Sequence, residues 1–365
     1  MGKLKSPLPS KYKYRYEQIL NLIAQSGEIP TDLYQYIGIK HDTFRQALST
    51  LKRKGYITLK NDDKLKGYVL QTKGKEYLRE NSRLYSNGQP IQQRVSDVKK
   101  RRRNHMFGIL YATFDRIGIE YQTEARNKRK NHSETSEEVL FFSAGSYKTE
   151  WQERGATFKG SRCYGFLVGK GHVYPVYATN NALPEFTKAE AALVNQLSKD
   201  YREGEKIKHA ILFCRDTESV KRIIGQLYDF EHSGKGENLL RSEYFDDIYV
   251  VPMNNCFEKS IKAIYHFDRL KSLVFDKLKI KPEYDSKMTD GYINETEGVI
   301  FLPTLSIAKL KPFISSNREK NKERTHQEHI VCYDFNVSAV KEHIKNDNNI
   351  RIISIKTEEG SRAKD

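Results

Sequence analysis

The stretch TDLYQYIGIKHDTFRQALSTLKRK, from Thr31 to Lys54, restricts the fold of this chain more than any other. Apolar residues recur in it at i, i+3, i+4 and i+7, which places them on one stripe of a helix. They are Phe44, Ala47, Leu48 and Leu51. At about 100° per residue, the opposite face presents hydrogen-bonding side chains. That face comprises Asp42, Gln46, Ser49 and Arg53, with Arg45 and Thr50 on its flanks. The pattern predicts a helix with one face in a core and one face suited to base edges.

Two helices are predicted before this one. Apolar periodicity predicts the first over Tyr14–Gln25. Pro30 followed by Thr31 is typical of a helix start, so we expect Thr31 to be the N-cap of a short second helix. Gly38 interrupts the pattern and is expected to end that helix.

A hairpin and a closing helix are predicted after it. Gly55 is placed as a helix stop, and Tyr56–Leu59 and Tyr68–Leu70 have the composition of short strands. Between the strands, Lys60–Gly67 (KNDDKLKG) forms a polar tip rich in lysine. A further helix is expected over Thr72–Asn81.

This order of elements over residues 11–82 resembles the winged helix-turn-helix family of DNA-binding domains. The resemblance implies that the third helix contacts double-stranded DNA, although winged helices also serve as protein-interaction modules, and that alternative stays open. The residues expected to contact DNA are Thr43, Arg45, Gln46, Ser49, Thr50 and Arg53 of the helix and Lys60, Lys64 and Lys66 of the hairpin.

Composition is compatible with a nucleic-acid partner. The 365 residues are 38% hydrophobic, enough for two or three domains with buried cores. Lysine and arginine exceed the acids, 63 against 47, so the formal charge is +16 and positive surface must be exposed. A Lys-rich proteome would give the same excess. A membrane surface is a weaker candidate, because no basic amphipathic helix with a bulky apolar face is apparent.

Cysteine usage and the N-terminus favour a reduced, cytoplasmic location. The four cysteines have no short spacing, which argues against a zinc site made from cysteine pairs and against a disulfide framework. They are Cys163, Cys214, Cys256 and Cys332. The sequence has no apolar run of ~18 residues, and MGKLKSPLPSKYKYRY lacks the apolar core of a signal peptide.

Residues 83–104 are predicted to be a basic linker. Hydrophobic content falls there, and the segment ends in five adjacent cations, Lys99, Lys100, Arg101, Arg102 and Arg103. Five neighbouring cations cannot all be paired locally, so we expect them to contact DNA phosphates, the alternative being a solvated first helical turn. A second basic cluster follows at residues 126–130.

Beyond the linker, residues 105–315 are predicted to form an α/β domain with a mixed sheet, so that the chain is α+β overall. The expected strands are Glu138–Ser143, Tyr147–Trp151, Arg162–Val168, His172–Tyr177, Lys208–Phe213 and Ile248–Val251, and the expected helices are Thr187–Tyr201, Thr217–Tyr228 and Asn255–Val274. A polar loop at 316–328 precedes a strand-helix-strand unit at 329–365, built from Ile330–Tyr333, Val337–Lys345 and Ile350–Ile355. Whether that unit completes the same sheet is open at this level.

A metal-dependent nuclease site is only partly present. Such a site needs carboxylates around Mg²⁺ or Mn²⁺ and a lysine that orients water. The candidates are Lys148, Asp115, Glu120 and Glu138. A second group of acids, Asp216, Glu218 and Asp334, follows two strands, but a helix cap is the favoured interpretation of Asp216. His326 and His329 lack a third histidine nearby.

Short motifs in the α/β region add a second resemblance. They are Phe141-Phe142-Ser143, Lys148, Ser161-Arg162, Gly165-Phe166-Leu167, Val176-Tyr177 and Glu190. This pattern resembles winged-helix proteins of Firmicute plasmids and integrative elements, which are similar to replication-relaxation proteins and to mobilisation relaxases with a restriction-endonuclease-like fold. The family pattern has an acid two positions before the lysine and an asparagine after the Val-Tyr pair, where this chain has Ser146 and Ala178.

Two classes of function follow. The first is a non-catalytic DNA-binding protein of a plasmid or other mobile element, which recognises an origin or operator in replication, mobilisation or its regulation and needs no cofactor. The second is a relaxase or nicking endonuclease that uses Mg²⁺ or Mn²⁺. The serine at position 146 favours the first class. Other replication or mobilisation proteins are further candidate partners, and the oligomeric state stays open, with a dimer as one alternative.

Overall fold

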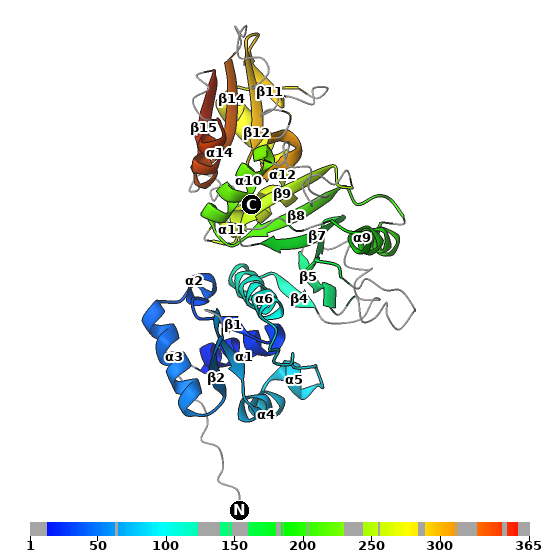
Figure 1. Cartoon of the computed structure of the whole chain (residues 1–365). Coiled ribbons are helices and arrows are strands. Elements are labelled where there is room, and N and C mark those ends of the chain that lie inside the picture. The colour runs from blue at the N-terminus through cyan, green and yellow to red at the C-terminus, as the bar shows by residue number, and fades with distance from the viewer. Residues whose placement is uncertain are drawn as a thin grey trace, which may run out of the picture. The chain divides into compact units, whose positions relative to one another are not determined.

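The computed structural model shows a mixed α/β protein of the α+β class, with helices and several sheets. It describes residues 13–62, 65–122, 139–145, 147, 160–179, 184, 186–202, 204–229, 244–254, 256–283, 289–310, 312, 327–344 and 349–356. The chain divides into two compact units, unit 1 over Met1–Ile119 and unit 2 over Glu120–Asp365 (Figure 1).

Helices make up most of unit 1. They are α1 (Lys13–Ser26), α2 (Tyr34–Ile37), α3 (His41–Arg53), α4 (Thr72–Asn81), α5 (Arg83–Ser86) and α6 (Val98–Ile117). The predicted apolar stripe of α3 is confirmed, since all four of its residues are buried. Gly38 and Gly55 follow α2 and α3 with φ of 75° and 72°, so both predicted stops are confirmed. Thr31 as an N-cap was wrong: α2 begins at Tyr34, after Leu33, without a side-chain cap.

A three-stranded antiparallel sheet completes unit 1. Its strands are β1 (Ile29–Pro30), β2 (Ile57–Asp62) and β3 (Leu65–Leu70), in the order β1-β3-β2. The predicted hairpin is confirmed but is longer than expected, because Lys60, Asn61 and Asp62 continue the ladder with β3. Pairing between backbones therefore extends into the segment whose polar composition indicated a loop.

The boundary expected at residue 104 lies instead at Ile119. The predicted basic linker contains α5 and the first turns of α6, whose N-cap Asp97 accepts from the backbone N–H of Lys100 at 2.8 Å. The boundary lies there because α6 has an apolar face that is buried in unit 1. Ile109 and Phe114 of α6 are buried, and this helix packs on α1 and α2. Burial of that face makes α6 part of the core of unit 1.

A seven-stranded mixed sheet forms the centre of unit 2. Its strands are β4 (Glu120–Gln122), β5 (Leu140–Ser143), β6 (Gly165–Gly169), β7 (His172–Thr179), β8 (His209–Cys214), β9 (Asp247–Pro252) and β13 (Leu305–Ser306), in the order β13-β9-β8-β7-β6-β5-β4. The predicted hairpin is confirmed, and Lys170 and Gly171 form its two-residue turn with φ of 50° and 72°. Strands β7, β8 and β9 are parallel. The predicted strand Tyr147–Trp151 lies outside the described residues except Tyr147, which is helical.

The C-terminal segment belongs to a second sheet of five strands. These are β10 (Lys281–Pro282), β11 (Gly291–Asn294), β12 (Glu297–Leu302), β14 (Gln327–Tyr333) and β15 (Ile350–Ile355), in the order β10-β11-β12-β14-β15. The strand-helix-strand unit therefore adds to β12, with β12, β14 and β15 all parallel. Strands β10, β11 and β12 have no counterpart among the predicted elements. The predicted polar loop falls largely on residues 313–326, outside the described residues.

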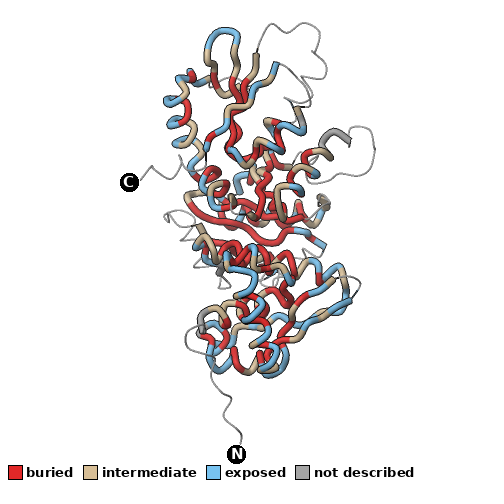
Figure 2. The backbone as a smooth tube through the Cα atoms, turned by 90° about the vertical axis from the view of Figure 1, so that its left-hand side faces the viewer, coloured by how far each residue is buried: buried red, intermediate tan, exposed pale blue. Residues whose placement is uncertain are grey.

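Helices cover both faces of these sheets. They are α9 (Lys188–Tyr201), α10 (Thr217–Asp229), α11 (Phe257–Tyr265), α12 (Phe267–Leu278) and α14 (Val337–Ile344), with a 3-10 turn, η2, over Asp334–Asn336. Along β12 the side chains alternate: Ile300 joins a core with residues of α9, α10 and α14, whereas Phe301 joins a second core with Phe275. Buried residues, red in Figure 2, fill the inner strands of the seven-stranded sheet: every residue of β6 and all but the first of β7 and of β8 are buried. No helix of the described part is long and apolar enough to cross a membrane.

Candidate functional site

The exposed side of α3 is the candidate nucleic-acid interface in unit 1. Its apolar stripe faces the core, so the remaining positions face solvent. Arg45, Gln46, Ser49 and Arg53 are exposed, and Thr43 and Thr50 are half-buried. We call these six residues the α3 face. Tyr34 supports the start of the helix, with its ring 5.0 Å from that of His41 and 6.2 Å from that of Phe44.

The hairpin β2–β3 contributes fewer free cations than the sequence predicted. Lys66 is exposed. The side chain of Lys60 is only 10% exposed, because its ammonium donates to the carbonyl of Val95 at 3.0 Å and lies 3.3 Å from Asp62. Lys64 lies outside the described residues. Lys60 therefore ties the hairpin to the segment before α6, which corrects its assignment as a DNA contact.

Helical geometry places the five cations at the start of α6 on different faces, so some are exposed and one is buried. Lys99, Lys100 and Arg102 are exposed, and Arg103 is half-buried with its guanidinium 5.6 Å from the ring of Phe107. Arg101 is fully buried, so it cannot contact phosphate. This position corrects the prediction that all five cations face DNA.

Arg101 instead lies at the centre of an interior network. Its Nε and Nη2 donate to the two carboxylate oxygens of Glu28 at 2.8 and 2.6 Å, a bidentate pair. Its Nη1 donates to Asp62 at 3.0 Å, and Nη2 also reaches the carbonyls of Lys60 and Leu65. The guanidinium therefore joins α6, the segment before β1 and the hairpin β2–β3.

Glu28 is held ionised within this network. It is 1% exposed, and burial alone raises the pKa of its carboxyl. Hydrogen bonds from Arg101 and from His105, whose Nε2 lies 2.8 Å from Glu28, lower that pKa more, so the net value is below 4.5. Neither Glu28 nor His105 is among the site residues predicted from the sequence. The indication was available, because Arg101 and His105 are four apart and lie on the buried face of α6.

Gly67→Ala is expected to destabilise unit 1 by about 1–3 kcal/mol. An added Cβ would meet the carboxylate of Glu28 and the imidazole of His105, and neither can move without breaking the network. Gly225→Ala in α10 is the control, because its Cβ would meet nothing and alanine favours a helix. Urea unfolding would check both, and a Gly67→Ala protein as stable as the unchanged protein would contradict the expectation.

Two of the four predicted catalytic residues, Asp115 and Glu120, lie within the described residues. Asp115 is half-buried on α6 in unit 1, where it accepts from Gln18 at 3.4 Å. Glu120 is exposed on β4 in unit 2, and Lys148 and Glu138 lie outside the described residues. Within the described ranges, no three His, Cys, Asp or Glu side chains are close enough to hold a metal ion.

Asp216, one of the second group of acids, has a structural role. Asp216 caps α10, accepting from the backbone N–H and the hydroxyl of Ser219 at 2.7 and 2.8 Å, so the helix-cap interpretation is confirmed. Asp334 follows β14 in the five-stranded sheet, whereas Asp216 follows β8 in the seven-stranded one. His329 pairs with Glu297 at 2.9 Å, and His326 lies outside the described residues.

Three residues of the short motifs converge on the interior carboxylate of a fourth, Glu190, in unit 2. Glu190 is fully buried on α9 and accepts from the hydroxyl of Ser161 at 2.9 Å, from the backbone N–H of Arg162, and from the hydroxyl of Tyr177 at 3.2 Å. Burial, together with nearby Cys163 and Glu190, raises the pKa of Tyr177 well above its ordinary value, so its hydroxyl remains a donor. The network fastens α9 to β7 and to the segment before β6.

No protein-family model, no curated protein and no solved structure matches this chain.

Proposed function

We propose that the protein is a sequence-specific DNA-binding protein whose unit 1 is a winged helix with α3 as its recognition helix. The observation that supports the proposal most directly is the α3 face: four exposed and two half-buried polar residues lie on a helix whose other side is buried. Hydrogen-bonding side chains on an exposed helix are the means by which bases are read in the major groove.

Cations at two further places add affinity without specificity. Lys66 on the hairpin and Lys99, Lys100 and Arg102 on α6 are exposed. Contacts of this kind go to phosphates and release counterions, in keeping with the formal charge of +16. We further propose an origin or operator of a plasmid or other mobile element as the target, on the strength of the resemblance in the short motifs.

Arg53→Ala and Gln46→Ala are each expected to weaken binding to the cognate site by about 1–3 kcal/mol and to leave non-specific binding nearly unchanged. Selection of bound sequences from a random duplex pool would give the site, and titration of labelled duplexes would measure affinity. Arg79→Ala is the matched control, an exposed arginine on α4 outside the α3 face. Equal losses on all sequences would show that α3 does not read bases.

Salt dependence and nicking complete the test. Roughly six to ten phosphate contacts lose about 10³ to 10⁵ in affinity between ~50 and ~200 mM salt. A flat salt response would overturn the proposal. Incubation with supercoiled DNA in Mg²⁺, Mn²⁺ or EDTA separates the two classes of function: protection without nicking is expected, and metal-dependent nicking within the protected site would identify a relaxase.

A further inference from the structure

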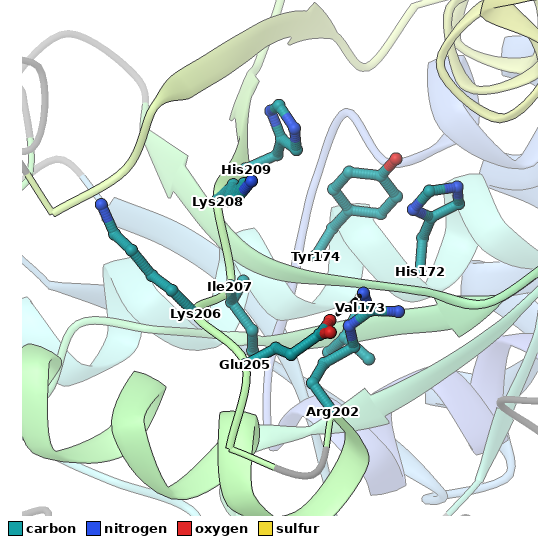
Figure 3. A pocket seen from close by; sticks show the side chains of 9 residues that line it. All are labelled: His172, Val173, Tyr174, Arg202, Glu205, Lys206, Ile207, Lys208 and His209. Atoms are coloured by element: carbon teal, nitrogen blue, oxygen red, sulfur yellow. Dashed lines mark hydrogen bonds and ion pairs between the residues drawn. The ribbon is translucent and has the colours of Figure 1, made fainter.

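A cavity of about 470 Å³ opens in unit 2 where β7 and β8 begin and α9 has ended. Its lining includes His172 and Tyr174 of β7, Arg202 beyond α9, and Lys208 and His209 at the start of β8 (Figure 3). This volume lies within the range of small-molecule sites, about 300–1,000 Å³. The α3 face belongs to unit 1, so this cavity is a separate candidate site.

Cations outnumber acids around the cavity. Three lining residues, Arg202, Lys206 and Lys208, are cationic, and Glu205 is the acidic lining residue. The guanidinium of Arg202 is fixed, donating to the carbonyl of Gly171 at 2.6 Å and to Glu205 at 2.7 Å. Lys206 pairs with Asp246 at 3.1 Å outside the lining.

Lys208 differs from these cations. It is exposed, and the described residues offer its ammonium no ion-pair partner. An anion in the cavity would therefore meet one ammonium that is paired with no acid among the described residues. Arg202, whose guanidinium is held in place, belongs to the same lining.

Aromatic rings form one wall. The rings of His172 and Tyr174 lie 5.8 Å apart and are tilted by 30°, and the ring of His209 lies 6.5 Å from Tyr174. Tyr174 is held from behind by Tyr265, whose ring meets it edge-on at 5.3 Å. His172 and Tyr174 are two apart on β7, so they share a face of the strand (Figure 3). His172 is exposed and Tyr174 is only 5% exposed, so the ring of His172, fixed at the end of this row, offers the surface on which a planar heterocycle stacks.

The two histidines can also form hydrogen bonds at neutral pH. Burial lowers the pKa of both His172 and His209 from 6.5, so each ring is neutral, with one N–H donor and one nitrogen acceptor. His209 Nδ1 is buried and has no hydrogen-bond partner among the described residues. A buried polar atom of this kind costs stability unless a partner is supplied.

We propose that this cavity binds a nucleotide, with the base on the ring of His172, at the end of the row that it forms with Tyr174 and His209, and the phosphate at Lys208 and Arg202. Cationic side chains provide the anion contact and the rings provide the stacking surface, and the two lie in one cavity of suitable size. The nucleotide is either a free nucleoside monophosphate or one nucleotide unit of a single DNA strand, because both present the same base and phosphate.

Calorimetric titration of the full-length protein tests the site. The probes are the four deoxynucleoside 5′-monophosphates, a 5′-phosphorylated tetradeoxynucleotide, deoxyadenosine and inorganic phosphate. Lys208→Glu is expected to weaken nucleotide binding at least about tenfold. Lys281→Glu is the matched control, an exposed lysine that begins β10, and is expected to leave binding unchanged. His172→Ala is expected to weaken nucleotide binding while leaving that of inorganic phosphate unaltered.

Each outcome decides the proposal. Tighter binding of the tetranucleotide than of the monophosphates assigns the site to a DNA strand, and the reverse order assigns it to a free nucleotide. Either result, if lost in Lys208→Glu, supports the site. Absence of binding by every nucleotide probe overturns the proposal, as does equal binding by the Lys208→Glu protein. Inorganic phosphate that binds as tightly as the nucleotides would show an anion site without a base.

Discussion

Arg101→Met is expected to lower the free energy of unfolding of unit 1 by about 3–5 kcal/mol, because it leaves the carboxylate of Glu28 buried without its main partner. Methionine keeps much of the side-chain volume, so the loss arises from the charge and its hydrogen bonds. Arg102→Met removes the neighbouring, exposed arginine and is expected to change stability by no more than about 0.5 kcal/mol.

Amide hydrogen exchange over a urea series measures this loss within the intact protein. Peptides from α1 and α6 report on unit 1, and peptides from β8 serve as an internal reference for unit 2. Faster exchange is expected in α1, α6 and the hairpin β2–β3 together. Arg101 lies on α6 and bonds to Glu28, just after α1, and to backbone carbonyls of the hairpin. Exchange equal to that of Arg102→Met would contradict the role assigned to the buried pair.

The difference between the unchanged protein and Arg101→Met depends on pH. Because the pKa of Glu28 is lowered in the folded state, its ionised form contributes stability that is complete above the unfolded value of 4.5 and is lost as the pH falls through the lower, folded value. The gap between the two proteins is therefore expected to be largest near neutral pH and to narrow below pH 4.5. A gap of constant size would show that Glu28 is not the group involved.

Glu190→Ala is expected to destabilise unit 2 by about 3 kcal/mol or more, since three donors lose their acceptor at once. The hydroxyls of Ser161 and Tyr177 are buried, and water does not replace the carboxylate without rearrangement. Exchange of peptides from β7 and α9 reports the effect. Glu258→Ala is the control, an exposed acid paired with Lys262 four residues on, for which less than about 1 kcal/mol is expected.

A Glu190→Ala protein that exchanges like Glu258→Ala would mean that the interior carboxylate is dispensable for the fold. Glu190→Gln refines the comparison. The amide keeps one acceptor oxygen for the hydroxyl donors, so an intermediate loss is expected.

Sequence patterns predicted elements where periodicity was strong. The four-residue stripe of α3, the closing helix α4 and the hairpin β6–β7 appear at or near their expected bounds. Strands β10 and β11 were missed because they are only two and four residues long. All of their residues except Gly291 are exposed or half-buried, so they give no continuous apolar run. β11 pairs with β12, and β12 pairs with β14, which is distant in sequence. No local sequence pattern specifies which strands pair in this way.

The candidate sites were predictable to different degrees. The α3 face follows directly from helical geometry, because six of its positions lie off the apolar stripe. A run of five cations indicates that some remain unpaired, but it does not indicate which one is buried. Arg101 could be distinguished from the other four only by its position on the helix face that it shares with His105. The cavity at His172 and Lys208 joins segments that are distant in sequence, so their proximity depends on the parallel pairing of β7 and β8.

The buried pair of Arg101 and Glu28 also determines how long an N-terminal segment must be to fold when recombination transfers it to another gene. A fragment that ends at Asn81, after the last element of the predicted winged helix, would retain Glu28 without the helix that neutralises it. One that ends at Ile119 includes α6 and every partner described for that carboxylate. Exchange of unit 1 between proteins is thus expected to preserve α6 with it, whatever domain follows.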